Sequence, residues 1–219
     1  MASYRSGRKA DNKQNANEFY DLSRPLEPGE RIDLFISHSW SDDNTTKWLH
    51  LSQLAEKFHA QNSRYPTFWL DKFCLRINNG DPTEALRGLC ACIFACNRLV
   101  ALCGMTFPSR LWCAWEVFVM TAFQHKSEAI ARVELILLIS DDDVDVREAF
   151  RIFDVATTKC YSPMDQHRLM RIIDAVGRSD FNDKIRKMAK VPLETTKAQK
   201  PPQHSSPKAS SHQRTGIHT

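Results

Sequence analysis

Apolar residues in the middle of the chain form two kinds of segment. Short segments that are apolar almost throughout are typical of strands buried on both faces of a parallel sheet. These segments are RIDLFIS (31–37), TFWLD (67–71), RLVALCG (98–104), RVELILLIS (132–140) and VATTKCY (155–161). Between them lie longer segments whose apolar residues recur at helical spacing. The pattern therefore predicts strands that alternate with helices.

The first helical segment spans residues 45–60, directly after the first predicted strand. Its apolar residues fall on one side of a helix, and that side should face the sheet. The residues on this side are Trp48, Leu51, Leu54, Ala55 and Phe58. We expect Asn44 or a neighbouring Thr to cap the start of this helix.

Two later segments carry the signals of a helix start. In DPTE (81–84) an Asp can act as N-cap, with Pro at the first helical position and Glu in the first turn. This helix should reach about Cys96. SPMD (162–165) repeats the pattern and predicts a helix that runs to Val176 and ends at Gly177.

The order of these elements predicts the fold class. Strands that alternate with helices form a parallel sheet with helices on both faces. Five such strands are typical of a flavodoxin-like sheet with strand order 2-1-3-4-5. Ligands of these sheets bind beyond the carboxyl ends of the strands. The loops at 38–44, 72–81 and 105–109 should therefore line any binding site.

The composition divides the chain into four parts. Residues 1–30 form a polar extension, and residues 31–177 form the α/β domain that holds every predicted strand. Residues 178–190 are basic and predicted to be helical. Residues 191–219 are rich in Pro, Ser, Thr, Lys and Gln, which predicts a disordered tail. From Arg178 onward nine Lys and Arg stand against three Asp and Glu, so this part carries a net charge of +6 within a total of +4.

The uneven charge and the cysteine usage bear on partners and location. The basic tail could contact nucleic acid or acidic lipid, or could act as a solvated tail that keeps the chain soluble. The N-terminal residues are polar, and no apolar run approaches the ~20 residues that span a bilayer. The seven Cys lie inside apolar segments, which favours free thiols in a reducing compartment. We therefore expect a cytoplasmic protein without a membrane span, for which nucleic acid is not the main partner.

Several common functional motifs are absent from the sequence. The chain contains no GxGxxG after the first strand, no GxxxxGK[ST], no HExxH and no GxSxG. Cys90, Cys92 and Cys96 fall within one predicted helix, at spacings that do not bring three thiolates to one metal. We therefore interpret them as packed thiols and expect no metal site.

One carboxylate stands in an otherwise apolar helix. The stretch RLWCAWEVFVMTAF (110–123) follows a helix start at 108–109, and Glu116 is its one acidic residue. The helical neighbours of Glu116 are Trp112, Cys113, Val119 and Met120. Desolvation among such neighbours would raise its pKa and make it a candidate site residue. Alternatively, this end of the helix could protrude into solvent, or Glu116 could form a structural ion pair with an Arg such as Arg98 or Arg110.

The loop after the first strand reads HSWSDDNTT (38–46). Ordinary turn and capping chemistry accounts for the residues from Asp42 to Thr46. It does not account for His38 and Trp40, because a Trp in a loop usually packs on another group. This loop is therefore a second candidate for ligand contact.

Three segments together resemble a known family. DLFISHSWSDD, FWLDKFCL and SRLWCAWEVFV are similar, in order and spacing, to three motifs of TIR domains (Toll/interleukin-1 receptor/resistance-protein domains). The most similar variant is the TIR-like segment of some protist and oomycete proteins. The resemblance covers about residues 31–176 and implies a signalling domain with the fold given above. Many TIR domains cleave NAD at the nicotinamide–ribose bond, whereas others act by assembling with one another.

The resemblance also implies roles for individual residues. Glu116 matches the catalytic glutamate, and NAD would be a substrate rather than a cofactor. The residues implied to bind the substrate are His38, Ser39, Trp40, Asp71, Gly80 and Trp112. Two features depart from the family: the loop after the first strand has no Arg, and Asn-Asn-Gly replaces the usual Pro-Gly before residue 81.

Three functions remain compatible with these observations. The first is an NAD-cleaving enzyme with Glu116 as its catalytic carboxylate. The second is a non-catalytic module that self-associates, or binds other TIR-like domains, through its loops, including 72–82. The third is a flavodoxin-like binder of another small ligand, in which Glu116 has no role. The most informative observation is whether Glu116 opens into a cleft beside loop 38–41 or is sealed in a salt bridge.

Overall fold

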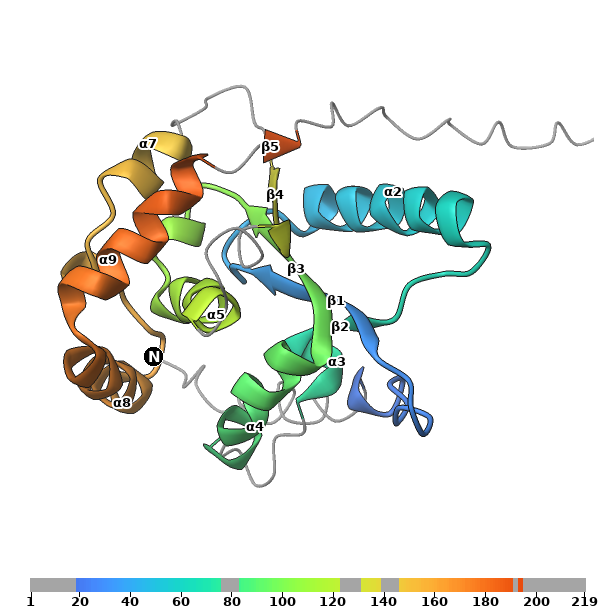
Figure 1. Ribbon diagram of the computed structural model, residues 1–219, viewed down its shortest axis with the longest axis horizontal. Coiled ribbons are helices and arrows are strands. Elements are labelled where there is room, and N and C mark those ends of the chain that lie inside the picture. Colours follow the sequence, from blue (N-terminus) through green and yellow to red (C-terminus); the bar gives the residue numbers. More distant parts are fainter. Residues whose placement is uncertain (1–18, 76–82, 123–130, 139–145, 191–192, 195–219) are drawn as a thin grey trace, which may run out of the picture.

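A parallel sheet forms the centre of the protein (Figure 1). The computed structural model describes residues 19–75, 83–122, 131–138, 146–190 and 193–194. Within them the strand order is β2-β1-β3-β4-β5, and every neighbouring pair is parallel. The strands are β1 (Ile32–His38), β2 (Phe68–Trp69), β3 (Cys96–Cys103), β4 (Val133–Leu137) and β5 (Leu193–Glu194). The predicted α/β class and the order of the first four strands are confirmed.

The predicted fifth strand at 155–161 is wrong. Val155–Thr157 form a short 3₁₀ turn, η2, and Lys159 makes only an isolated bridge to Arg110. The Asp154 carboxylate accepts a hydrogen bond from the Ala156 backbone N–H and so caps the turn. A capping side chain of this kind offers the backbone hydrogen bonds other than those of a strand. Here this effect outweighs the strand preference of the β-branched residues in the segment.

The fifth place in the sheet is taken by a segment from the predicted disordered tail. Leu193–Glu194 pair with Leu135 and Ile136 of β4. The remainder of that tail, 195–219, lies outside the described residues. Two residues of a mainly polar segment carry too little apolar pattern to predict a strand.

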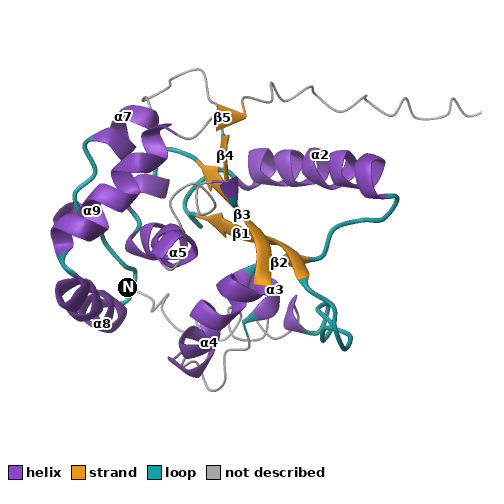
Figure 2. Cartoon of the chain, viewed as in Figure 1, coloured by secondary structure: helices purple, strands orange, loops and turns teal. Residues whose placement is uncertain are grey.

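Helices cover both faces of the sheet (Figure 2). One face is covered by α2 (Asn44–Asn62), which packs on Leu34 and Ile36 of β1. The opposite face carries a larger core built with several helices. These helices are α4 (Thr83–Ala95), α5 (Leu111–Ala122), α7 (Val146–Arg151), α8 (Pro163–Val176) and α9 (Arg178–Arg186). The remaining elements are α3 (Asp71–Cys74), η1 (Phe107–Ser109) and η3 (Lys187–Lys190).

The side of α2 that faces the sheet agrees with the prediction in part. Leu54 is buried and Leu51 packs against the same cluster, as predicted, whereas Trp48 is 72% exposed and Lys47 and His50 are buried. Lys47 can occupy the buried side because its ammonium donates to the Ser39 carbonyl at 2.9 Å. The cap also differs from the prediction, since the Asp43 side chain accepts from the backbone of the first turn.

The later helices agree more closely with their sequence signals. In α8 the Ser162 side chain accepts from the Asp165 backbone N–H, Pro163 follows it, and the helix ends at Gly177 with φ of 103°. The proposed cap of α4 at 81–82 lies outside the described residues. The core continues beyond residue 177, because Phe181 and Ile185 of α9 are buried in the same cluster as α5.

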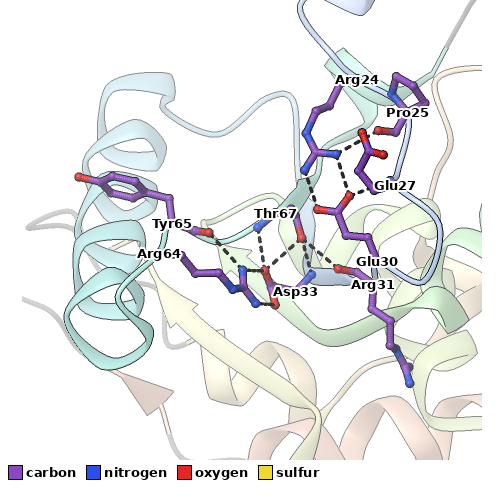
Figure 3. Close-up of polar contacts among 9 residues, drawn as sticks. All are labelled: Arg24, Pro25, Glu27, Glu30, Arg31, Asp33, Arg64, Tyr65 and Thr67. Carbon is purple, nitrogen blue, oxygen red and sulfur yellow. Dashed lines mark hydrogen bonds and ion pairs between the residues drawn. The ribbon is translucent and has the colours of Figure 1, made fainter.

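A carboxylate joins β1 to the segment before β2 at the amino end of the sheet (Figure 3). Both oxygens of Asp33 accept from the Arg64 guanidinium, at 2.6 and 2.9 Å. The backbone N–H and hydroxyl of Thr67 also donate to Asp33. The pKa of Asp33 is held below its usual value, and the hydrogen bonds from Arg64 are the largest cause. Burial acts in the opposite direction. This network positions β2, whose own pairing with β1 is short.

A second carboxylate joins two loops at the carboxyl end. Asp42, after β1, accepts from the backbone N–H and hydroxyl of Thr106, after β3, at 3.0 and 2.7 Å. The contact requires a glycine at 104, because a Cβ there would lie 2.4 Å from the Asp42 Cγ.

The described part of the chain contains no helix that is both long and apolar enough to cross a membrane.

Substituting Gly104 with Ala should therefore destabilise the protein. The added Cβ must displace a carboxylate that Thr106 holds, so we expect the free energy of unfolding to fall by about 1–3 kcal/mol. Gly88→Ala is the matched control, since nothing lies within 4 Å of its added Cβ and the site is an exposed helix position. It should raise the free energy of unfolding by up to about 1 kcal/mol. Urea denaturation followed by circular dichroism measures both, and equal effects of the two changes would contradict this account.

Candidate functional site

Glu116 lies against the carboxyl end of the central strands. It sits in the second turn of α5, after the predicted start at 108–109 has formed the 3₁₀ turn η1. The hydroxyl of Ser37, near the end of β1, donates to Glu116 Oε2 at 2.5 Å. Ser37 is fully buried and pairs in register with Ala101 of β3. The carboxyl group is thus at the sheet edge where parallel sheets bind ligands.

The surroundings of the Glu116 carboxyl favour its protonated form. Its neighbours Cys113, Val119 and Met120 are buried apolar groups. Burial raises the pKa of Glu116 to about 8, the Ser37 hydrogen bond lowers it, and the negative charge of Asp71 raises it further. The residue keeps partial exposure although protein atoms surround the carboxyl group. Among the described residues, no Lys, Arg or His forms an ion pair with it.

The alternative ion-pair partners lie elsewhere. Arg98 pairs with Glu134 of β4. Both belong to the α2 face of the sheet, where they line a cavity of about 30 Å³ together with Leu34 and Leu54. A cavity of this size holds about one water molecule, so it does not offer a substrate site. The structure gives Arg110 no ion pair with Glu116. The structural ion pair that was the alternative for Glu116 is therefore not formed.

Asp71 binds two of the other residues implied by the family resemblance, His38 and Trp40. It begins α3, and its Oδ1 accepts from His38 Nε2 at 3.1 Å and from the Lys72 backbone N–H at 2.6 Å. Its Oδ2 accepts from Trp40 Nε1 at 2.6 Å. Burial would raise the pKa of Asp71, but the His38, Trp40 and backbone interactions hold it below its usual value. Asp71 is therefore an ionised group with protein donors on both oxygens.

His38 and Ser39 are largely enclosed by the protein. The His38 carbonyl accepts from the Cys113 thiol at 3.4 Å, and its Nδ1 is buried without a hydrogen-bond partner. Ser39 is 1% exposed, and its hydroxyl donates to the Thr106 hydroxyl oxygen at 2.6 Å, since the Thr106 proton goes to Asp42. Ser39 therefore stabilises the loop after β1, while His38 links the end of β1 to both α3 and α5.

The aromatic residues near Glu116 have different exposures. Trp40 is 64% exposed and is anchored at its indole nitrogen, so its ring is available to a ligand. Trp112, one turn before Glu116, is partly buried against the main core. Trp115 is a core residue, 8% exposed and stacked on Phe118. Gly80, the remaining implied residue, lies outside the described residues.

Ser37 and Lys47 were not identified from the sequence. A Ser inside an apolar strand suggests a polar contact on one face, and this was the available signal for Ser37. Lys47 brings a cation to the loop that lacks an Arg, although its ammonium is buried. Burial lowers the pKa of Lys47, while Asp42, Asp43 and Asp71 act in the opposite direction.

The cysteines have the character of packed thiols. Burial raises the pKa of Cys90, Cys92 and Cys113, so these thiols stay protonated near neutral pH. Cys96 is buried, and burial raises its pKa to about 12. Within the described ranges, no group of three His, Cys, Asp or Glu side chains is arranged to hold a metal ion.

Comparison with solved structures shows a weak structural likeness. No protein-family model matches the chain, and no curated protein matches it. Among solved structures, the chain is similar to the TIR domains in "Structure of the activated Roq1 resistosome directly recognizing the pathogen effector XopQ". The TM-score is 0.43 and the identity 16%, over 75% of this chain and 87% of that chain. A likeness at this level carries no conclusion about activity, substrate or assembly.

Proposed function

We propose that this chain is a TIR-like signalling domain that hydrolyses NAD at the nicotinamide–ribose bond, with Glu116 as its catalytic carboxylate. One observation carries the proposal. The Glu116 carboxyl is desolvated, makes no ion pair among the described residues, and lies at the ligand-binding edge of a parallel sheet. A carboxyl group that is kept out of water without a cation is costly to the fold, and such groups concentrate at functional sites.

The reaction needs one carboxylate. The nicotinamide ring of NAD is cationic, so the bond from ribose C1′ to the ring nitrogen breaks with its electron pair going to nicotinamide, which leaves neutral. No general acid is required. Positive charge develops on the ribose as an oxocarbenium ion, and a nearby carboxylate stabilises it. Water then adds to C1′ and releases its proton, which gives ADP-ribose.

The raised pKa of Glu116 fits this reaction. In the free site at neutral pH, the group is mainly protonated and tolerates its apolar surroundings. The arriving substrate carries a positive charge on the nicotinamide, and a positive charge nearby favours the ionised carboxylate. In this proposal substrate binding itself generates the reactive form, and the exposed indole of Trp40 gives an aromatic ring of NAD a surface on which to stack.

A second candidate is the non-catalytic assembly module. It is favoured by large apolar side chains that remain exposed near the same edge of the sheet. They are Trp40 at 64%, Trp48 at 72% and Met105 at 51% exposed. Exposed apolar side chains can mark a protein interaction surface when they form a patch. In this case Glu116 would have no role in assembly.

Glu116→Gln should abolish the proposed activity while preserving the fold. The amide keeps the size of the side chain and can still accept from Ser37, but it cannot carry the charge that stabilises the oxocarbenium ion. We expect nicotinamide release from NAD to fall at least about 100-fold, measured by chromatography with concentrated, assembled protein. Glu148→Gln, an exposed carboxylate that pairs with Arg151, should have no effect. Equal release by Glu116→Gln and the unmodified chain would refute catalysis, and intact assembly without any release would favour the second candidate.

The pH dependence of the reaction should report the same group. The ionised form of Glu116 is active, so kcat/KM should rise about tenfold per pH unit below its pKa and level off above it. For the free protein the inflection is expected near pH 8, because burial raises the pKa of Glu116 to about 8. Initial rates of nicotinamide release between pH 6 and about 9 measure the profile. A flat profile, or one that falls as the pH rises, would contradict the role of the carboxylate.

A further inference from the structure

Asp71 is the point at which three parts of the candidate site meet. His38 at the end of β1, Trp40 in the following loop and the backbone of α3 all donate to its carboxylate. Each oxygen has at least one donor from the protein. An ionised group with both oxygens engaged in this way is suited to holding its neighbours in place rather than to binding substrate directly.

The residues held by Asp71 are attached to the strand end that contacts Glu116. Ser37, which donates to Glu116, directly precedes His38. The His38 carbonyl in turn accepts from the thiol of Cys113, one turn before Glu116 on α5. Asp71 and Glu116 are therefore connected through the last two residues of β1. A change at Asp71 can reach Glu116 through this connection as well as through its charge.

We propose that Asp71 is a positioning residue, which holds the exposed Trp40 indole beside the end of β1 and sets the charge environment of Glu116. This inference rests on the proposed NAD hydrolysis. It revises the role implied by the family resemblance, in which Asp71 binds the substrate. The substrate contact passes instead to Trp40, whose ring is exposed while its nitrogen is fixed.

The physical basis of the positioning role is the strength of the Trp40 contact. A side chain that is 64% exposed has few packing contacts to fix its rotamer. The hydrogen bond from its indole N–H to an ionised carboxylate is charge-assisted and therefore stronger than a neutral one. Holding the ring before the substrate arrives avoids the entropy loss of ordering it on binding. Loss of the contact should therefore appear mainly in KM.

The charge of Asp71 gives a second, independent readout. The Glu116 carboxyl interacts with Ser37 from β1 and Asp71 from α3, and Cys113 lies beside it on the same helix. Of these, Asp71 is the ionised one. Its negative charge disfavours ionisation of Glu116, so removing that charge should let Glu116 ionise at lower pH.

The test compares three variants of the full chain. Asp71→Asn removes the charge and cannot satisfy both His38 and Trp40. We expect the KM for NAD to rise about tenfold with kcat within about threefold, and the kcat/KM inflection to move down by about half a pH unit. Trp40→Phe, at an exposed position, removes the indole donor and keeps the charge. It should raise KM to a similar extent without moving the inflection.

Asp33→Asn is the matched control. Asp33 is also a carboxylate that bridges β1 to a neighbouring segment, but it lies at the amino end of the sheet. It should lower the melting temperature and leave both KM and the inflection unchanged. The proposal is overturned if Asp71→Asn has the same KM and the same kcat/KM inflection as the unmodified chain. It is also overturned if Asp33→Asn shows the rise in KM and the shifted inflection, because the effect would then come from general loosening of the fold.

Two measurements separate this proposal from the proposed function. The indole proton of Trp40, assigned by its loss in Trp40→Phe, should move upfield in the NMR spectrum of Asp71→Asn. The ¹³C titration of the Glu116 carboxyl should also shift to lower pH in that variant. Both are made without NAD. If they change as expected while no variant cleaves NAD, the positioning geometry stands and the proposed hydrolysis fails. If neither changes, Asp71 does not position the site.

Discussion

The hydrogen bond between the Ser37 hydroxyl and the Glu116 carboxyl is the contact on which the candidate site depends. It joins β1 to α5. A hydroxyl can donate to a carboxylate or accept from a carboxylic acid, so the contact tolerates either protonation state of Glu116. A cation in its place would hold Glu116 ionised and lower its pKa. Because Ser37 is neutral, it does not fix the charge of Glu116, and that charge can change when a ligand binds.

Four carboxylates around β1 show how differently one chemical group can be used. Asp33 and Asp71 receive several N–H donors, and the pKa of each is held below its usual value. Asp42 accepts from Thr106 and ties two loops together at the carboxyl edge. Glu116 receives one hydroxyl in a desolvated place, and its pKa is raised. The first three therefore hold strands and loops together, whereas the pKa of Glu116 is raised by burial without a cationic partner among the described residues.

The fold was predictable where burial alone decides the structure. Apolar runs identified β1, β3 and β4, and the Ser162–Pro163 signal identified the start of α8, because both depend on local composition. The strand predicted at 155–161 does not form, because a capping side chain rather than composition decides the backbone conformation there. Conversely, Leu193–Glu194 form a strand that was not predicted, since a polar segment pairs with the edge of β4.

The site was predictable to a similar degree. The apolar neighbours of Glu116 pointed to a raised pKa without any knowledge of the fold. The sequence could not show that Arg98 faces the opposite side of the sheet, because that depends on the strand register. It also could not show that Ser39 is buried while Trp40 is exposed, since adjacent loop residues have no fixed periodicity. The burial of Lys47 could not be predicted either, because its partner is a backbone carbonyl, which every sequence contains.

The most direct test of this account is a titration of the Glu116 carboxyl itself. The protein would be labelled with ¹³C at the glutamate side-chain carboxyl carbon, and the Glu116 signal assigned by its absence in Glu116→Gln. The account predicts an inflection near pH 8, because burial without a cationic partner raises the pKa of Glu116 to about 8. An inflection near 4.5, the ordinary value for a glutamate, would show that the group is solvated or paired and would contradict the account.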